Sequence, residues 1–312
     1  MLYLQNNLSK VIFMMPAFEQ LGLLLLFMSI GYFFGKSGLI DRSHAKVLSV
    51  AGVYLFLPCT IFNSFSKSFT PANLTQYYPL LLGSGVILLV LYVFAHLVSG
   101  LFVREGYQRK VFLYSLIVPN YGYMGYAMAE GLFGSDGLLE LILFSLPISL
   151  YTYTAGFAML TKRPVSLKKL LNPVNVAVLL GILVGLFGIR MPSLASLFLT
   201  KSAGCMAPVS MLLAGLTISE FDFKALIADK KSYAMCALRL LVIPLAIFFA
   251  LRTVTDNQTL LRTALLFYAM PCGMNTIVFP KLVDEDCSTG ASLALLSNVL
   301  SMLTIPLCLS LL

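Results

Sequence analysis

The chain consists of long apolar runs separated by short polar connections. A helix rises 1.5 Å per residue, so about 20 apolar residues cross the roughly 30 Å hydrocarbon core of a bilayer. The runs are continuously apolar and do not alternate, which favours helices over a β-barrel. We predict ten membrane-spanning helices, at residues 17–35, 45–66, 76–103, 110–133, 137–160, 172–189, 195–218, 232–251, 262–282 and 288–311.

Composition supports the same class of protein. Hydrophobic residues make up 59% of the 312 residues and charged residues only 11%, and the mean hydropathy is +0.91. A soluble domain carries about 25% charged residues, so soluble enzymes, coiled coils and nucleic-acid binders are excluded. The six cysteines form no C-x-x-C pair and there are only two histidines, so we expect no disulfide framework, metal or cofactor. We predict an all-α polytopic membrane protein.

Basic residues are distributed unevenly over the connections. Of the 21 Lys and Arg residues, 14 lie after the first, third, fifth, seventh and ninth runs, including Arg163, Lys168 and Lys169; the other side, with both termini, holds 6. Cytoplasmic loops of membrane proteins are enriched in Lys and Arg. We therefore expect a multi-pass protein of the cell (inner or cytoplasmic) membrane with both termini extracytoplasmic.

The second half of the chain matches the first half after a shift of about 152 residues. The matched pairs are Lys110 with Arg262, Pro119 with Pro271, Ser145 with Ser297 and, at a shift of 150, Pro58 with Pro208. Five helices per copy is an odd number, so two copies must lie in the membrane with opposite orientation. We predict a 5+5 inverted repeat, residues 1–160 and 161–312, as in many secondary transporters. Chance coincidence in apolar sequence is the alternative.

Two of the runs carry a proline, glycines and an asparagine near mid-membrane. They read Pro119-Asn120-Tyr121-Gly122-Tyr123-Met124-Gly125-Tyr126 and Met270-Pro271-Cys272-Gly273-Met274-Asn275-Thr276. Proline removes a helical hydrogen bond and glycine eases unwinding, and backbone groups freed at this depth need protein or a wet cavity around them. Broken helices offer positive N-termini to an anion, and the two asparagines add amide donors. Simple packing kinks are the other interpretation.

These segments resemble the auxin efflux carrier family, which includes bacterial malate and malonate permeases and plant auxin carriers. The run from Ala269 to Leu312 is similar to the C-terminal end of that family, and residues 120–125 are similar to its N-x-G-x-x-G segment. Leu57-Pro58 and Ala207-Pro208 also fit. The family usually has proline two residues after the second glycine, where this chain has Ala127, and here Pro119 precedes the asparagine instead.

The resemblance implies a secondary carrier for a small organic anion, mostly a carboxylate, that moves by an elevator-type shift. Helices 4 and 9 would cross; helices 3–5 and 8–10 would form a transport domain; helices 1, 2, 6 and 7 would form a scaffold, which is often dimeric. Protons or the membrane potential would drive it. The candidate substrate-binding residues are Pro119, Asn120, Tyr121, Gly122, Arg239, Pro271, Gly273, Asn275, Thr276 and Asn298.

Some roles stay open on the sequence alone. Arg239 lies inside a predicted helix, where it could balance a carboxylate or extend toward the cytoplasmic face. His96 could carry a coupling proton or be structural. An enzyme is disfavoured, because no nucleophile, metal-protease or paired-aspartate motif falls within the helices. An anion channel and a membrane-embedded sensor of the same fold remain alternatives to a carrier.

Overall fold

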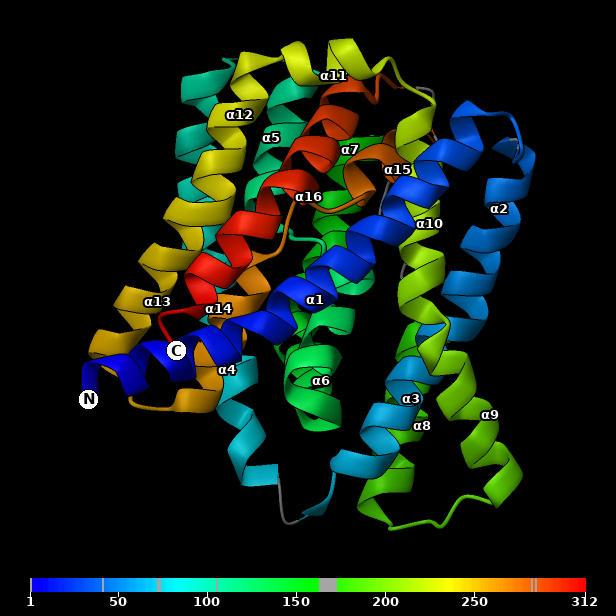
Figure 1. Ribbon diagram of the computed structural model, residues 1–312, viewed down its shortest axis with the longest axis vertical. Coiled ribbons are helices and arrows are strands. Elements are labelled where there is room, and N and C mark those ends of the chain that lie inside the picture. The colour runs from blue at the N-terminus through cyan, green and yellow to red at the C-terminus, as the bar shows by residue number, and fades with distance from the viewer. Residues whose placement is uncertain are drawn as a thin grey trace.

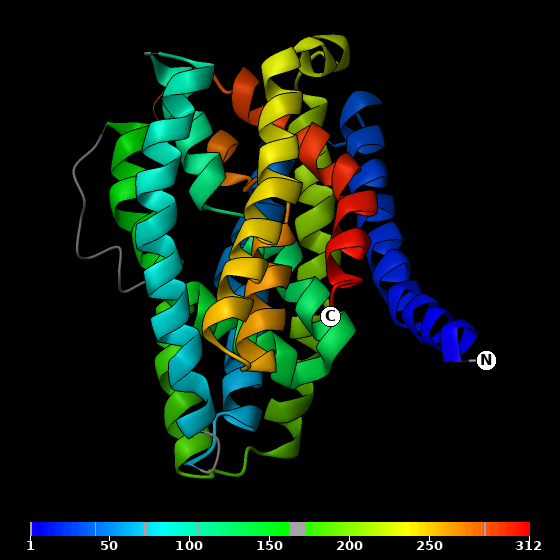
Figure 2. The same ribbon diagram turned by 90° about the vertical axis from the view of Figure 1, so that its left-hand side faces the viewer.

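The computed structural model describes residues 2–40, 42–71, 74–104, 106–162, 173–281, 283 and 285–312. Arg163, Lys168 and Lys169, which count toward the charge bias, lie outside these ranges. The described chain is a bundle of helices (Figures 1 and 2). In order, these are α1 (Leu2–Lys36), α2 (Arg42–Ala51), α3 (Leu57–Ser68), α4 (Leu74–Phe102), α5 (Tyr107–Ile117), α6 (Tyr126–Tyr151), α7 (Phe157–Thr161), α8 (Pro173–Leu186), α9 (Ser193–Gly204), α10 (Met206–Ser219), α11 (Phe223–Ala228), α12 (Lys230–Ala237), α13 (Ile243–Val254), α14 (Gln258–Ala269), α15 (Asn275–Lys281) and α16 (Ser288–Leu309). Four π-helical turns join neighbouring helices: η1 (Gly52–Phe56), η3 (Tyr121–Gly125), η4 (Thr152–Gly156) and η6 (Leu238–Val242).

Within the described ranges, seven helical stretches are long and apolar enough to cross a membrane. They are Met15–Lys36, Lys46–Ser68, Tyr77–Phe102, Tyr121–Thr161, Ser193–Ser219, Lys230–Val254 and Ser288–Leu309. The sequence predicts ten, and the difference has three structural causes. The predicted helices 110–133 and 262–282 are each interrupted. Helix α8 has only 14 residues. The stretch Tyr121–Thr161 counts once although Gly134, at φ 69° and ψ −162°, breaks it.

Glycines four residues apart bring two pairs of helices into close contact. On α1, a Cβ at Gly31 would lie 2.2 Å from the carbonyl oxygen of Leu212 on α10, and Gly35 packs on the same helix. On α8, Gly181 and Gly185 pack on α3, where a Cβ at Gly185 would lie 2.4 Å from the Phe69 carbonyl oxygen. Small residues at this spacing let membrane helices approach backbone to backbone.

The interior of the bundle is formed mainly by α5, α6, α14 and α16. Tyr114, Phe144, Phe267 and Tyr268 are fully buried and their rings pack against one another or against neighbouring aromatic rings. Helix α4, in contrast, exposes many large apolar side chains, as a helix facing lipid would. The short helices α5 and α14 therefore lie inside the protein, where their broken ends are covered.

The connections α1–α2, α4–α5 and α10–α11 lie at the upper end of the bundle in Figure 1, and α3–α4 and α8–α9 lie at the lower end. At the upper end, Lys162 pairs with Glu285. Burial raises the pKa of Tyr107 there, with Glu285 adding to the effect, so its hydroxyl stays protonated and donates to the Leu160 carbonyl oxygen at 2.8 Å. These contacts join α5, α7 and the segment before α16.

Candidate functional site

Two helices end at a proline in the middle of the bundle. Helix α5 ends at Ile117 and α14 at Ala269, and the residues that follow, Val118 and Met270, have extended backbone angles. Each of these residues precedes a proline, and steric clash with the proline ring disfavours the helical conformation there. The interruptions that the sequence predicts at Pro119 and Pro271 are therefore present.

The two extended segments pair with each other. Pro119 and Cys272 form an isolated antiparallel bridge, and the Asn120 amide N–H donates to the Pro271 carbonyl oxygen at 2.8 Å. The Cys272 N–H donates to Ser297 Oγ on α16 at 2.9 Å. Gly273 permits the close approach, because a Cβ there would lie 3.3 Å from the Pro119 carbonyl oxygen. One backbone N–H at each break is thus satisfied, that of Asn120 by the other break and that of Cys272 by a serine side chain of α16.

New helical segments begin directly after the place where the segments at Pro119 and Pro271 pair, which we call the crossing point. The π-helical turn η3 starts at Tyr121 and continues into α6, while α15 starts at Asn275. The first N–H groups of a helix lack partners within it and carry a partial positive charge. Both helical segments therefore begin in the same region. The N–H groups of Thr276 and Ile277 in α15 already donate to the Gly273 and Met274 carbonyl oxygens, at 3.3 and 2.9 Å.

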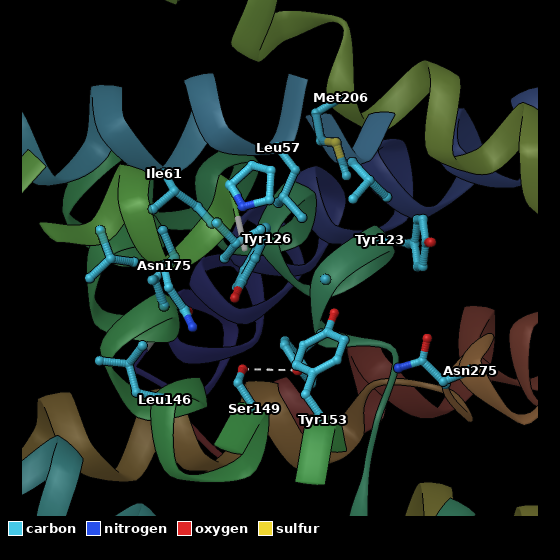
Figure 3. A pocket seen from close by; sticks show the side chains of 18 of the residues that line it. Leu57, Ile61, Tyr123, Tyr126, Leu146, Ser149, Tyr153, Asn175, Met206 and Asn275 are labelled. Atoms are coloured by element: carbon cyan, nitrogen blue, oxygen red, sulfur yellow. Dashed lines mark hydrogen bonds between the residues drawn. The ribbon is translucent and has the colours of Figure 1, made fainter. Parts of the chain in front are cut away.

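That region adjoins a cavity of about 670 Å³. Six of the ten predicted site residues line it: Pro119, Asn120, Tyr121, Gly122, Gly273 and Asn275. Figure 3 shows side chains from several elements directed into this space, which we call the main cavity. The described lining contains tyrosine, asparagine and serine among apolar residues, and no Lys, Arg, His, Asp or Glu.

The two asparagines have different surroundings. Asn120 is 2% exposed, and neither its side-chain oxygen nor its nitrogen has a hydrogen-bond partner within the described part of the chain. Asn275 is less buried, and its Nδ2 donates to Tyr114 Oη on α5 at 3.1 Å. Amide orientation is assigned from such partners, so Tyr114 determines which end of the Asn275 amide faces the cavity.

Six polar lining residues were not predicted: Tyr54, Tyr123, Tyr126, Ser149, Tyr153 and Asn175. Ser149 and Tyr153 lie four residues apart and so share a helix face, a spacing that a search for polar faces would have found. The Tyr121 and Ser149 hydroxyls lie 2.9 Å apart, as do those of Tyr126 and Ser145. These bonds fix two aromatic walls of the main cavity.

Three other predicted residues lie beside the crossing point and do not line the main cavity. Pro271 contributes its carbonyl oxygen to the paired segments. Thr276 is buried and its Oγ1 donates to the Gly273 carbonyl oxygen at 2.9 Å. Asn298 is buried on α16, where Nδ2 donates to the Ala294 carbonyl oxygen at 2.7 Å. Pro271 and Thr276 thus form hydrogen bonds within the paired and broken segments, whereas the hydrogen bond of Asn298 lies within α16.

Arg239 lies behind the crossing point, fully buried, and also does not line the main cavity. Its Nη1 donates to the Tyr268 carbonyl oxygen at 2.8 Å, and the guanidinium carbon lies 5.7 Å from the centre of the Tyr268 ring. Its Nε and Nη2 have no partner among the described residues. Tyr268 is in the last turn of α14, so Arg239 sits at the negative end of that helix. It does not extend to the molecular surface.

The chain is similar to known membrane transporters over nearly its whole length. A family model described as membrane transport protein matches residues 16–169 and 159–309. An uncharacterized transporter of Methanocaldococcus jannaschii is 26% identical over 303 residues, which cover 91% of this chain and 95% of the relative. An uncharacterized transporter of Methanothermobacter thermautotrophicus is 25% identical over 302 residues (91% and 94%). The uncharacterized transporter YfdV of Escherichia coli K12 is 24% identical over 306 residues (91% and 94%).

Proposed function

The chain belongs to the membrane transport protein family, the auxin efflux carrier family that its sequence motifs indicate, and on that premise we propose that it is a secondary carrier for a small organic anion. It is a multi-pass membrane transporter and not an enzyme. The observation that carries the proposal is the crossing point itself. There, the start of η3 and the unpaired amide of Asn120 lie beside one cavity.

An anion suits this site because its positive potential comes from backbone and amide donors. Helix N-termini bind carboxylates without a full positive charge. The orphaned side chain of Asn120 offers two N–H donors that no described protein atom uses. The described residues that line the main cavity include no cationic side chain, so a second negative charge on the substrate would be buried unpaired there. We therefore favour a monocarboxylate with an apolar body over a small dicarboxylate.

Ten passes through the membrane account for the helices better than seven. The break at Gly134 divides Tyr121–Thr161 into two passes. The first of these completes the pass that α5 begins, and α14 with α15 makes another. Helix α8 is short but apolar throughout. Broken helices are tolerated at this depth where the protein covers their ends, as it does here.

Several irregularities recur at a shift of 150 to 152 residues, which supports an inverted repeat of residues 1–160 and 161–312. Helices α5 and α14 end at positions 117 and 269. The turn at Cys205 corresponds to η1 in the other half, each just before a proline. Gly31 and Gly35 on α1 correspond to Gly181 and Gly185 on α8.

Alternating access follows from this arrangement as an elevator-type movement. The passes that include α1, α3, α8 and α10 form the scaffold, held by the glycine contacts and paired in a homodimer. The crossing point and its neighbours form the transport domain. The connections at the upper end of Figure 1 are the basic ones and face the cytoplasm, so both termini are extracytoplasmic and the protein resides in the cell membrane.

The membrane potential or a proton gradient supplies the energy. A monoanion leaving an inside-negative cell gains about 2.3 kcal/mol per 100 mV. Export of a monocarboxylate therefore needs no nucleotide.

Reconstituted vesicles test the proposal. Purified protein is first screened against a panel of monocarboxylates and dicarboxylates by thermal shift, and the stabilising compounds are then tested for uptake. Saturable uptake that is accelerated by unlabelled substrate on the opposite side identifies a carrier. Uptake without such counterflow identifies a channel. Stabilisation without any flux identifies a sensor. No binding of any carboxylate contradicts the proposal.

A further inference from the structure

A second, smaller cavity of about 160 Å³ adjoins the main one. Four residues line both cavities: Gly122, Tyr123, Tyr126 and Met206. A residue that lines two cavities is part of the wall between them, so these four residues form a partition. Of these four residues, only Gly122 has a role predicted from the sequence, as a candidate binding residue.

The two cavities lie on opposite sides of the partition along the long axis of the bundle. The main cavity reaches Ser149 and Tyr153, toward the end of the α6–η4–α7 stretch that lies near the upper end. The smaller cavity reaches Glu130 and Gly131, toward the break at Gly134, and Gln20 on α1. The smaller cavity thus leads away from the basic end of the molecule.

The side chains of the partition are held by different contacts. The Tyr126 hydroxyl is hydrogen-bonded to Ser145, which lies beyond the Gly134 break, and this bond holds the Tyr126 ring in place. Met206 is buried, and its sulfur accepts a hydrogen bond from Ser210 Oγ at 3.6 Å. Tyr123 belongs to η3, three residues after Asn120, and is half-buried. Met206 is the first residue of α10, directly after the turn at Cys205, and its unbranched side chain adapts its shape readily. Figure 3 shows Tyr123 and Met206 on the same side of the main cavity.

We propose that Tyr123 and Met206 form the gate that closes the substrate cavity toward the extracytoplasmic side. The proposal rests on the carrier function, since a carrier must close one side of its cavity while the other is open. Tyr123 lies in the part assigned to the transport domain, and Met206 lies in the part assigned to the scaffold. Sliding of one part past the other separates these two side chains and joins the two cavities.

Cysteine accessibility tests the gate without relying on transport. The background variant is Cys205→Ser, because Cys205 is exposed beside the partition. Leu146→Cys reports on the main cavity alone and Ala203→Cys on the smaller cavity alone. A membrane-impermeant methanethiosulfonate is added to intact spheroplasts or to inside-out vesicles, and the rate of modification is measured for each reporter from each side.

We expect Leu146→Cys to react from one side and Ala203→Cys from the other in the background variant. Adding Tyr123→Ala or, independently, Met206→Ala should raise the rate of Leu146→Cys modification from the closed side by an order of magnitude or more. Tyr153→Ala is the matched control, because it also removes a tyrosine ring from the main cavity but lies outside the partition.

The gate is contradicted if Leu146→Cys stays protected from modification from the closed side in both gate variants while both variants are monodisperse in detergent. The accessibility result does not depend on a substrate. Absence of carboxylate transport with a gate that opens as expected would contradict only the carrier proposal. Carboxylate transport together with a Leu146→Cys modification rate that Tyr123→Ala and Met206→Ala leave unchanged would contradict only the gate.

Discussion

At the residue scale, the asparagine without partners is the more informative of the pair. A buried amide whose hydrogen bonds are unmade costs about 1–3 kcal/mol. Asn120 is such a residue, whereas Asn275 is held by Tyr114. A ligand that accepts hydrogen bonds from Asn120 recovers this free energy, which makes Asn120 the position where binding should be most sensitive to substitution.

Asn120→Ala should abolish measurable uptake and weaken binding by about 1.5–3 kcal/mol, the usual contribution of hydrogen bonds to a charged group. The unliganded protein should unfold at the same temperature or higher, because an unsatisfied group is removed. Uptake and thermal shift with the best carboxylate measure both effects. Asn63→Ala, on α3 and outside both cavities, is the control. Wild-type uptake by Asn120→Ala would remove this residue from the site.

Tyr114→Phe should weaken binding less than Asn120→Ala, because it frees the Asn275 amide without deleting it. The net contribution of such a hydrogen bond is about 0.5–1.5 kcal/mol, so we expect a several-fold rise in KM. Tyr268→Phe is a matched control, since the Tyr268 hydroxyl is buried without a partner in the described structure. Equal effects of the two substitutions would show that Tyr114 does not position Asn275.

For Arg239, burial at the end of α14 suggests an indirect role. Arg239→Gln removes a cation from a helix C-terminus, an interaction that contributes up to about 2 kcal/mol when partly buried. We expect a lower unfolding temperature and the same fractional loss of transport for monocarboxylates and dicarboxylates. A loss confined to dicarboxylates would instead place the guanidinium in contact with substrate during the cycle.

At the element scale, the breaks in the helices are predictable and their partners are not. Proline lacks an N–H and constrains the residue before it, so the interruptions at Pro119 and Pro271 follow from local chemistry. The pairing of Pro119 with Cys272, the bond from Cys272 to Ser297 and the position of Arg239 are tertiary contacts, which no local pattern specifies. The glycine pairs on α1 and α8 have a four-residue spacing that is visible in the sequence and indicates close helix packing, although it does not identify the partner helix.

Gly185→Ala tests the contact between α8 and α3. The added methyl group would lie 2.4 Å from a backbone oxygen that cannot rotate away, so the helices must separate. Overpacking of this kind usually destabilises by about 1–3 kcal/mol, which should appear as a lower unfolding temperature in detergent. Gly22→Ala on α1, where a Cβ meets nothing within 4 Å, should be neutral or slightly stabilising. If both variants behave alike, the glycine contact contributes nothing to stability.

At the scale of the whole molecule, helix length gives seven candidate passes in the described chain, whereas hydropathy predicts ten. Proline breaks leave α5, α14 and α15 short, and Tyr121–Thr161 counts as one stretch despite the turn at Gly134. The hydropathy of the sequence is not sensitive to these breaks, so it gives ten apolar segments. The membrane class and the family were predictable from composition and motifs. The main cavity was only partly predictable, because its lining combines residues far apart in the sequence, such as Tyr54, Tyr153 and Asn175.

The location of the two termini distinguishes ten membrane passes from seven. Ten passes place both termini on one side, and the charge bias makes that side extracytoplasmic. A C-terminal alkaline phosphatase fusion should therefore be active, and an N-terminal tag should be accessible to antibody on intact spheroplasts. Termini on opposite sides would require an odd number of passes and would contradict the inverted repeat.

The contact between α1 and α10 also has a consequence for biosynthesis. Backbone atoms of Met28 and Leu212 are the nearest neighbours of Gly215 and Gly31, so the first helix made has its partner almost two hundred residues later in the chain. Until α10 has been synthesised and inserted, the glycine face of α1 lacks its packing partner in the bilayer. The packing of α1 is therefore completed late in translation, and a chain truncated before α10 leaves its first helix available to other apolar helices or to quality-control proteases.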